Sequence, residues 1–224
     1  MVEIIVIAEG VTEEKFIKQV VAPALRPLQI FMKPLLLNTS QNAKGGAVTF
    51  DRLKFNARNT LRQFPNALLS TFLDLYALDT DFPGFAPAKE LAEVYARVAQ
   101  LERALHGAII AHVGCNPERF LPHIQPYEFE GLLFSDVHAL SAVEPTWAKG
   151  LAALSQVRMA AESPEHINEG FDTKPSRRLE DLLQPKYKKA FHGPRAAEHI
   201  TLEVMERECR HFAAWMESVR GAGR

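Results

Sequence analysis

Short apolar runs and longer amphipathic segments alternate along the first part of the chain. The runs are typical of strands that are buried on both faces of a parallel sheet. Three such strands are predicted, over residues 4–8, 30–37 and 67–73. The segments between and after them repeat apolar residues at helical spacing, which predicts helices over 12–25, 50–64 and 90–105. The alternating order indicates an α/β fold with right-handed crossovers and a parallel sheet.

The pattern changes in the second half of the chain. Two further strands are predicted over 107–113 and 119–125, and polar loops over 38–46 and 163–175. From Ser135 onward the strand signals stop, and helices are predicted over 137–143, 146–160, 176–183 and 196–219. We therefore expect an α/β core over residues 1–140 and a helical C-terminal extension, residues 141–224, packed on that core.

Composition favours a soluble, cytoplasmic protein. Apolar residues make up 47% and charged residues 24%, as in ordinary globular domains. No apolar run approaches the roughly 20 residues of a membrane-spanning helix, and the first residues do not resemble a secretory signal. Cys115 and Cys209 have no metal-like spacing and are expected to be buried thiols in a reducing compartment.

Acidic residues follow two of the predicted strands. Glu9 comes directly after the first strand and Asp74 after the third. Because the carboxyl ends of parallel strands meet at one edge of a sheet, where ligands bind, we expect these two carboxylates to lie together. Glu13, in the first helical turn, is expected beside them. Clustered carboxylates without neighbouring Cys or His ligands favour Mg²⁺ or Mn²⁺, and such sites usually act on phosphates.

Four other acidic residues are candidates for the same cluster. Asp79 and Asp81 lie in a turn-rich loop after the third strand. Glu128 and Glu130 precede a short apolar segment, where they either compensate a helix dipole or reach the metal site. The sequence leaves these two interpretations open.

Several familiar sites are excluded by missing motifs. The chain lacks the phosphate-binding loop, the dinucleotide-binding glycine fingerprint and the serine nucleophile elbow. The histidines His106, His112, His123 and His138 have no recognised metal-binding spacing, so structural or surface roles are expected for most of them.

The net charge gives no general indication of nucleic-acid binding, because 26 basic side chains are balanced by 27 acidic ones. Basic residues are nevertheless concentrated between residues 172 and 195, where seven of them stand against three acids. This basic patch consists of Lys174, Arg177, Arg178, Lys186, Lys188, Lys189 and Arg195. A patch of this kind is often a solvated helix face, so nucleic-acid binding does not follow from it alone.

Motifs spread over most of the chain carry a family resemblance. They are Glu9-Gly10-x-Thr12-Glu13, Asp74-x-Tyr76, Asp81-Phe82-Pro83-Gly84, Arg119-Phe-x-Pro-x-Ile-Gln125, Glu128-Phe-Glu-x-Leu-Leu-Phe134 and Pro175-Ser-x-Arg178. The first two resemble Toprim nucleases of the overcoming-lysogenization-defect type. The whole set is similar to a bacterial family of unknown function, domain of unknown function 4276, which is placed near those nucleases.

The resemblance implies roles for particular residues in a Toprim/Rossmann-like sheet. Glu9 would be the acid of the first motif, Glu13 a second metal ligand, and Asp74 the acid of the second motif. Independently of the resemblance, Lys174 and Arg178 are the basic residues expected to stabilise negative charge that develops on a phosphate. The usual second motif is Asp-x-Asp, but this chain has Tyr76 at the last position. Asp79, Asp81, Glu128 or Glu130 would have to replace the missing acid.

We therefore expect a divergent Toprim-type nuclease or phosphotransfer domain that uses Mg²⁺ or Mn²⁺ on nucleic acid. The resemblance also implies an ATPase partner in a bacterial defence or DNA-processing system. One alternative is a non-catalytic Toprim-fold interaction module for that ATPase, and another is a small-molecule phosphohydrolase.

Overall fold

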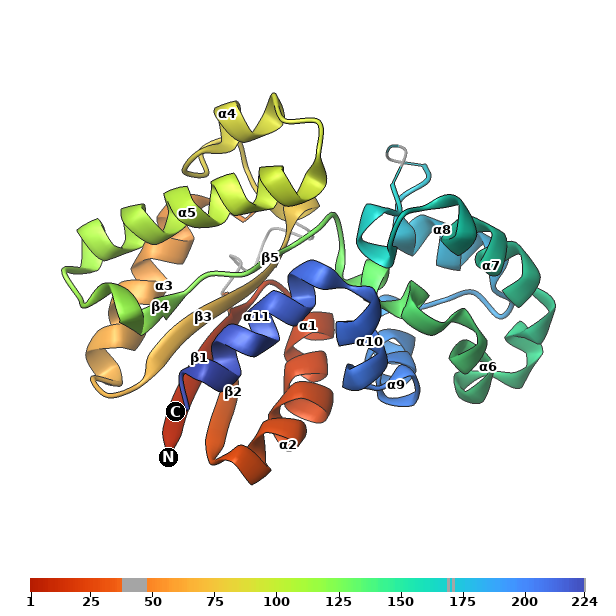
Figure 1. The fold of residues 1–224 in the computed structure, drawn as a ribbon, viewed down its shortest axis with the longest axis horizontal. Coiled ribbons are helices and arrows are strands. Elements are labelled where there is room, and N and C mark those ends of the chain that lie inside the picture. Colours follow the sequence, from red (N-terminus) through yellow and green to blue (C-terminus); the bar gives the residue numbers. More distant parts are fainter. Residues whose placement is uncertain (38–47, 169, 171, 224) are drawn as a thin grey trace.

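A parallel β-sheet forms the centre of the computed structural model, which describes residues 1–37, 48–168, 170 and 172–223. The strand order is β2-β1-β3-β4, and β5 also pairs with β3 (Figure 1). The strands are β1 (Val2–Ala8), β2 (Ile30–Leu36), β3 (Leu68–Asp74), β4 (Phe120–Leu121) and β5 (Ile124–Gln125). The prediction of an α/β fold with a parallel sheet and a helical C-terminal part is confirmed. Within the described residues, no helix is both long and apolar enough to cross a membrane.

Strand β1 lies between β2 and β3 and is buried on both faces, as its continuous apolar run predicts. Ile4 and Val6 contribute to one apolar core, and Ile5 and Ile7 contribute to the other. Pro34 lies in β2, opposite Val6. Because β2 is at the end of the strand order, the proline does not interrupt the interior of the sheet.

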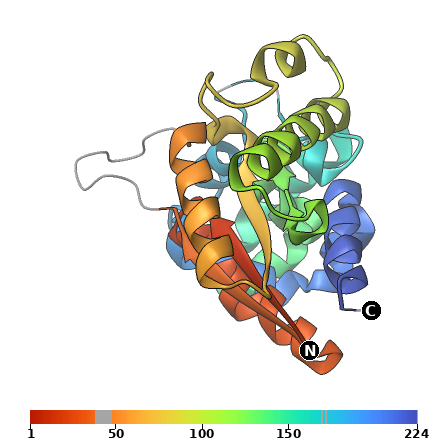
Figure 2. The ribbon, with the colours of Figure 1, turned by 90° about the vertical axis from the view of Figure 1, so that its left-hand side faces the viewer.

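Different helices cover the two faces of the sheet. The core that contains Ile5 and Ile7 is built with α3 (Phe50–Gln63), α4 (Phe85–Lys89) and α5 (Val94–Val113), and Figure 2 views the molecule from this side. The opposite core is built with a helical segment near the N-terminus and with the last helix, α11 (Arg210–Gly221). The N-terminal segment consists of α1 (Val11–Phe16), η1 (Ile17–Val21) and α2 (Ala22–Leu25).

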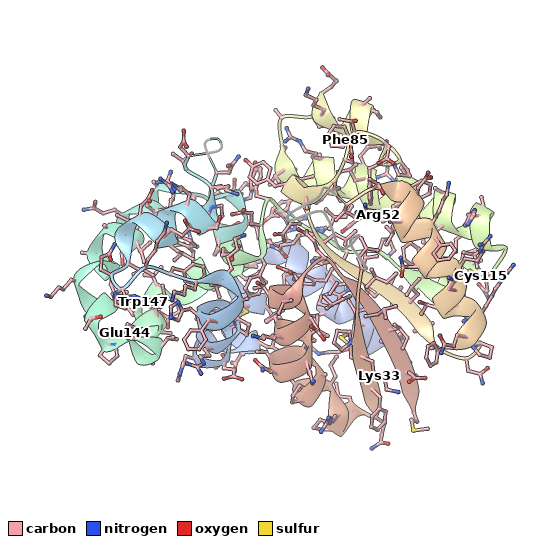
Figure 3. The ribbon with its side chains drawn as sticks, turned by 180° about the vertical axis from the view of Figure 1, so that it is seen from behind. Lys33, Arg52, Phe85, Cys115, Glu144 and Trp147 are labelled. Atoms are coloured by element: carbon pink, nitrogen blue, oxygen red, sulfur yellow. The ribbon has the colours of Figure 1, made fainter. Side chains whose placement is uncertain are left out.

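A second lobe lies beside the sheet (Figure 1). It contains η5 (Phe129–Ala139), α6 (Leu140–Val143), η6 (Pro145–Lys149), α7 (Leu151–Ala160), α8 (Pro175–Leu182), α9 (Lys189–Ile200) and α10 (Leu202–Glu208). Trp147 and Glu144 lie in this lobe, at the other end of the molecule from Cys115 (Figure 3). One apolar cluster runs from the sheet face into the lobe and joins Phe72 to buried Trp147. The predicted division into residues 1–140 and 141–224 stays a prediction, and the apolar core is continuous across it.

The strand predicted over 107–113 is wrong, because these residues form the last turns of α5. Leu101, Leu105 and Ile109 are buried at a spacing of four residues, so the run continues the apolar stripe of the helix. Helix α5 ends at Gly114, whose φ of +70° is the left-handed conformation that glycine favours at a helix C-terminus.

Other element boundaries also differ from the predictions. The strand predicted over 119–125 is two short strands, β4 and β5. The last helix, predicted as continuous over 196–219, is divided into α9, α10 and α11 by breaks at Thr201 and Cys209. The loop predicted over 38–46 lies outside the described residues. Cys115 and Cys209 are free thiols, but Cys209 alone is buried, and Cys115 is half-buried.

The phenyl ring of Phe16 joins four parts of the fold. Its centroid lies 5.7 Å from Phe72 of β3, 5.0 Å from Phe129 of η5 and 6.0 Å from Phe212 of α11. Phe16 itself belongs to α1 and is 0% exposed. The ring therefore holds the sheet, the N-terminal helix, the second lobe and the last helix around one point.

Substitution Phe16→Ala is expected to lower the free energy of unfolding by about 3–5 kcal/mol, because it leaves a cavity where these elements meet. Phe55→Ala is the matched control, since Phe55 is 55% exposed, and it should cost less than about 1 kcal/mol. Urea unfolding monitored by circular dichroism measures both values. Equal losses for the two variants would contradict the central role of Phe16.

Candidate acidic active site

Glu9 and Asp74 lie side by side at the carboxyl edge of the sheet. Strands β1 and β3 pair in parallel with Ala8 opposite Phe72, so the two strands end at the same edge of the sheet. The backbone N–H of Asp74 donates a hydrogen bond to Glu9 Oε2 at 3.1 Å. The structure thus brings together the two acids that the strand-end argument placed at one edge.

Glu13 joins this pair from the first turn of α1, and its side chain is buried. Gly10 precedes the helix in an extended conformation. A Cβ atom at Gly10 would lie 3.0 Å from Glu13 Oε2, a tight contact. Glycine at this position therefore leaves room for the Glu13 carboxylate beside the end of β1.

Glu128 and Glu130 also lie close to these acids, at the start of η5. Asp74 Oδ1 accepts a hydrogen bond of 2.8 Å from the backbone N–H of Phe129, the residue between the two glutamates. Glu128 is 3% and Glu130 1% exposed, so neither is a solvated residue at a helix N-terminus. We call Glu9, Glu13, Asp74, Glu128 and Glu130 the acidic cluster.

Lysine side chains bind one side of the acidic cluster. Lys189 Nζ lies 2.9 Å from Glu130 Oε2 and 3.4 Å from Glu128 Oε1. Lys174 Nζ lies 2.8 Å from Glu128 Oε1. The Tyr187 hydroxyl donates a hydrogen bond to Glu130 Oε1 at 3.2 Å. Glu128 and Glu130 are therefore held by groups from the second lobe.

The close approach of α9 to the cluster depends on Gly193. A Cβ atom there would lie 2.8 Å from the Tyr187 hydroxyl and 3.1 Å from the Phe129 ring. Helix α9 packs against α1 and η5 at this point. The lack of a side chain at residue 193 thus allows Lys189, one turn earlier, to reach the carboxylates.

Burial sets the protonation of the acids on the other side of the cluster. It raises the pKa of Glu9 to about 7, with a further contribution from the negative charge of Glu13. Burial and the charge of Glu9 raise the pKa of Asp74 well above its usual range. The pKa of Glu13 is also raised, again chiefly by burial. These three carboxyl groups lack sufficient positive charge and would be stabilised by a cation.

The pKa values of the two acids bound by lysine, Glu128 and Glu130, are shifted in opposite directions. Burial acts to raise the pKa of Glu128, but Lys189 and the hydrogen bonds from Lys174 and Ser176 outweigh it, so this pKa is lowered. Burial raises the pKa of Glu130 in spite of Lys189. For Lys189, the charges of Glu130, Asp74 and Glu128 overcome burial and raise the pKa. The lysine therefore stays charged and Glu128 stays ionised.

Asp79 and Asp81, the other candidate ligands, are engaged elsewhere. Both carboxylate oxygens of Asp81 accept from the backbone N–H of Phe50 at 3.2 Å, at the start of α3. Asp79 Oδ1 accepts from the N–H of Thr80 at 2.6 Å. Tyr76, at the position of the missing motif acid, is half-exposed and donates a hydrogen bond to Asn168. Of the four candidate acids, Glu128 and Glu130 are the two that the structure brings near Glu9 and Asp74.

The basic patch divides into residues with different contacts. Lys189 was expected only in a nucleic-acid-binding surface, but it forms an ion pair with the acidic cluster, as Lys174 does. Arg177 pairs with Asp181 at 3.0 Å, Lys186 pairs with Glu180 at 3.1 Å, and Arg195 lies over the Phe191 ring. Arg178 Nε donates to the Thr173 carbonyl at 2.7 Å, while Lys188 is exposed. Membership of the patch was the one sequence signal for Lys189, since its partner Glu130 is 59 residues away.

The sequence was compared with models of known protein families, and one family matches most of the chain. The model of a family described as a domain of unknown function, DUF4276, matches residues 8–220. The chain therefore belongs to the DUF4276 family, as the motifs indicated. Neither the curated proteins nor the solved structures contain a match to the chain.

The raised pKa of Glu9 predicts a pH-dependent difference between the wild type and Glu9→Gln in metal-free buffer. The pKa of Glu9 is about 4.5 in the unfolded chain and about 7 in the folded protein. As the pH rises through this range, the unfolded state loses its proton first, and the folded protein is destabilised. Glu9→Gln removes this penalty. Its stability relative to wild type should therefore increase by roughly 2–3 kcal/mol between pH 5 and pH 8. Chemical unfolding at several pH values measures this difference.

Glu14→Gln is the control, because Glu14 lies next to Glu13 in the first turn of α1 but outside the acidic cluster. Its stability relative to wild type should be constant over the same range. A constant difference for Glu9→Gln would show that Glu9 does not carry the burial penalty.

Lys189→Met is expected to destabilise the protein at pH 8 by leaving Glu128 and Glu130 without this cation. Removing one partner of a fully buried pair costs about 3–5 kcal/mol. Because the Lys189 side chain is 39% exposed, we expect a smaller loss of about 2–3 kcal/mol. Adding Glu130→Gln to Lys189→Met should recover part of it. Lys188→Met is the control, and a loss as large in that variant would contradict the prediction.

Proposed function

We propose that this DUF4276 protein is a divergent Toprim-type hydrolase that cleaves phosphodiester bonds in nucleic acid with Mg²⁺ or Mn²⁺. One observation supports it above all: five carboxylates from three segments, four of them buried and Glu9 half-buried, converge at the carboxyl edge of β1 and β3, with two lysines at one side. The position of Glu9 and Asp74 at the sheet edge and the motif Glu9-Gly10-x-Thr12-Glu13 agree with the Toprim resemblance. The Toprim relationship itself is part of the proposal.

The donor set fits a hard divalent cation. All five groups offer carboxylate oxygens, the ligands that Mg²⁺ and Mn²⁺ prefer. Glu128 and Glu130 are already paired with lysine. Glu9, Glu13 and Asp74, whose pKa values are raised by burial, gain most from a positive charge, so we assign the metal to these three. The acids from η5 compensate for the tyrosine at position 76.

The residues of the cluster suit phosphodiester hydrolysis. A bound divalent ion would supply Lewis-acid catalysis and activate water at neutral pH. The charge of the ion would keep Glu9 ionised as one of its ligands. Lys189 and Lys174 hold positive charge next to the acids and can stabilise negative charge on the phosphate.

Exposed basic side chains near this edge favour nucleic acid as substrate. Lys188 directly precedes Lys189, and Arg195 lies on the same helix, α9. Both are exposed, whereas Lys189 is turned toward the acids. Helix α9 and the preceding residue Lys188 thus supply one lysine for the site and two exposed cations for a phosphate backbone. The ATPase partner is proposed from the family resemblance.

Cleavage of plasmid, single-stranded DNA and RNA with Mn²⁺ or Mg²⁺ tests the proposal. Glu9→Gln and Asp74→Asn should each lose at least about 100-fold in rate, because both remove charge from the assigned metal ligands. Asp81→Asn is the matched control, since Asp81 binds the start of α3 and should retain activity. The ATPase, where one is encoded beside the chain, belongs in a parallel reaction.

The outcomes distinguish the alternatives. Equal cleavage by wild type and Glu9→Gln would overturn the assignment of the acids. Hydrolysis of a simple phosphomonoester, without cleavage of nucleic acid, would support a small-molecule phosphohydrolase. If calorimetry detects no Mn²⁺ binding and no substrate is cleaved, the interaction module is supported. Tyr76 in the second motif is the observation that favours this module.

A further inference from the structure

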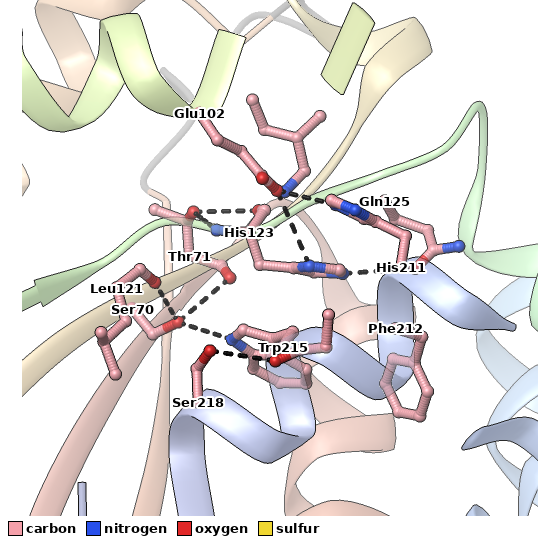
Figure 4. A network of polar contacts seen from close by, with 12 residues as sticks. Ser70, Thr71, Glu102, Leu121, His123, Gln125, His211, Phe212, Trp215 and Ser218 are labelled. Carbon is pink, nitrogen blue, oxygen red and sulfur yellow. Dashed lines mark hydrogen bonds and ion pairs between the residues drawn. The ribbon is translucent and has the colours of Figure 1, made fainter. Parts of the chain in front are cut away.

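Two imidazoles and a carboxylate meet at the β4/β5 edge of the sheet, between α5 on one face and α11 on the other (Figure 4). Glu102 comes from α5, His123 from the connection between β4 and β5, and His211 from the first turn of α11. One ligand atom of each lies within 4.8 Å of the others. None of the three belongs to the acidic cluster, so this group is a second, separate set of metal-ligand side chains.

The contacts within this group centre on one oxygen. Glu102 Oε1 lies 2.8 Å from His211 Nε2 and 3.8 Å from His123 Nδ1. It also accepts a 2.8 Å hydrogen bond from the backbone N–H of Ile124. Three elements distant in the sequence therefore direct their polar atoms to one point.

The hydrogen bonds around His123 define which ring nitrogen carries its proton. Gln125 Nε2 donates to buried Glu165 Oε1 at 3.4 Å, so the amide oxygen of Gln125 is the atom that faces His123. That oxygen lies 3.3 Å from His123 Nε2, which must act as the donor. The proton is therefore on Nε2, and Nδ1 presents a lone pair.

This lone pair points at an acceptor. His123 Nδ1 faces the Glu102 carboxylate, and two acceptors cannot form a hydrogen bond with each other. A cation between the two atoms would satisfy both. Metal-bound histidines commonly have this arrangement, with the second ring N–H held by an oxygen acceptor.

Glu165 positions the remaining ligand. Its two oxygens accept the backbone N–H groups of His211 at 2.8 Å and Phe212 at 3.0 Å. It thereby fixes the start of α11 as well as the Gln125 amide. One buried carboxylate, which does not belong to the triad, thus supports two of its three ligands.

We propose that Glu102, His123 and His211 bind a divalent transition-metal ion, for which zinc is the best fit. Two imidazole nitrogens and one carboxylate oxygen are a common zinc ligand set, and zinc binds them at about 2.0–2.2 Å. Ligands around a tetrahedral zinc are about 3.3 Å apart, between the 2.8 Å and 3.8 Å found here. The ion would replace the proton shared between His211 and Glu102.

The proposed site opens into a cavity of about 450 Å³. Its walls include His106, Phe120 and Trp215, and all three proposed ligands line it. A fourth coordination position can therefore be taken by water or a small ligand from the cavity. Because the ligands come from α5, the sheet edge and α11, a bound ion would also fasten the last helix to the core.

Binding of Co²⁺ to the metal-free protein tests this site, because tetrahedral cobalt gives visible d–d absorption that zinc abolishes on displacement. One equivalent is expected to give the tetrahedral spectrum. His211→Gln and Glu102→Gln should each weaken binding by more than about 100-fold, since both remove a direct ligand. The control His106→Gln changes a histidine of the same cavity outside the triad and should bind as the wild type does.

A Glu9→Gln/Asp74→Asn variant separates this site from the acidic cluster and should retain the cobalt spectrum. Circular dichroism checks that each variant is folded, and the two ligand variants keep the test valid if one of them fails to fold. The proposal is overturned by any of three results: no tetrahedral cobalt spectrum, an unchanged affinity in the folded ligand variants, or loss of the spectrum in Glu9→Gln/Asp74→Asn. Those results would leave the triad a hydrogen-bonded contact between α5 and α11.

Discussion

The crowding of five carboxylates, four of them buried and Glu9 half-buried, at one edge of the sheet is the constraint on which the arrangement of this protein depends. Each carboxylate loses hydration and repels its neighbours, so the cluster is tolerated only with compensating charge and hydrogen bonds. Lys174 and Lys189 supply the charge, and both belong to the second lobe. The helical lobe must therefore pack against the sheet for the acids to be buried. The compensation is incomplete, and the remaining cost appears as the raised pKa values of Glu9 and Asp74.

The parts of the fold that depend on local pattern could be predicted from the sequence. Continuous apolar runs predicted β1 and β3, and parallel pairing then placed Glu9 beside Asp74 without any knowledge of side-chain packing. Pro34 is compatible with the edge position of β2, because an edge strand tolerates a proline. The run over 107–113 was misassigned because short apolar runs fit a strand or a buried helix equally well. Only the packing of Ile109, in line with Leu101 and Leu105, distinguishes them.

The rest of the candidate site could not be predicted, because it depends on contacts between distant segments. Glu128 and Glu130 would point in different directions on a regular strand or helix, but the chain changes from extended to 3₁₀ geometry at this point and turns both inward. Lys189 was indistinguishable from its exposed neighbour Lys188 until α9 was placed against α1. His123 and His211 are 88 residues apart, so no spacing motif could have joined them.

The last helix connects the two proposed sites physically. His211 faces the cavity, and the next residue, Phe212, packs 6.0 Å from Phe16 and 6.5 Å from Phe72. Phe16 lies three residues after Glu13, and Phe72 lies two residues before Asp74. Tightly packed aromatic rings transmit a displacement because the interior leaves little free volume. The position of α11, fixed at its start by Glu165, is therefore shared by the histidine site and by the backbone that presents the acidic cluster.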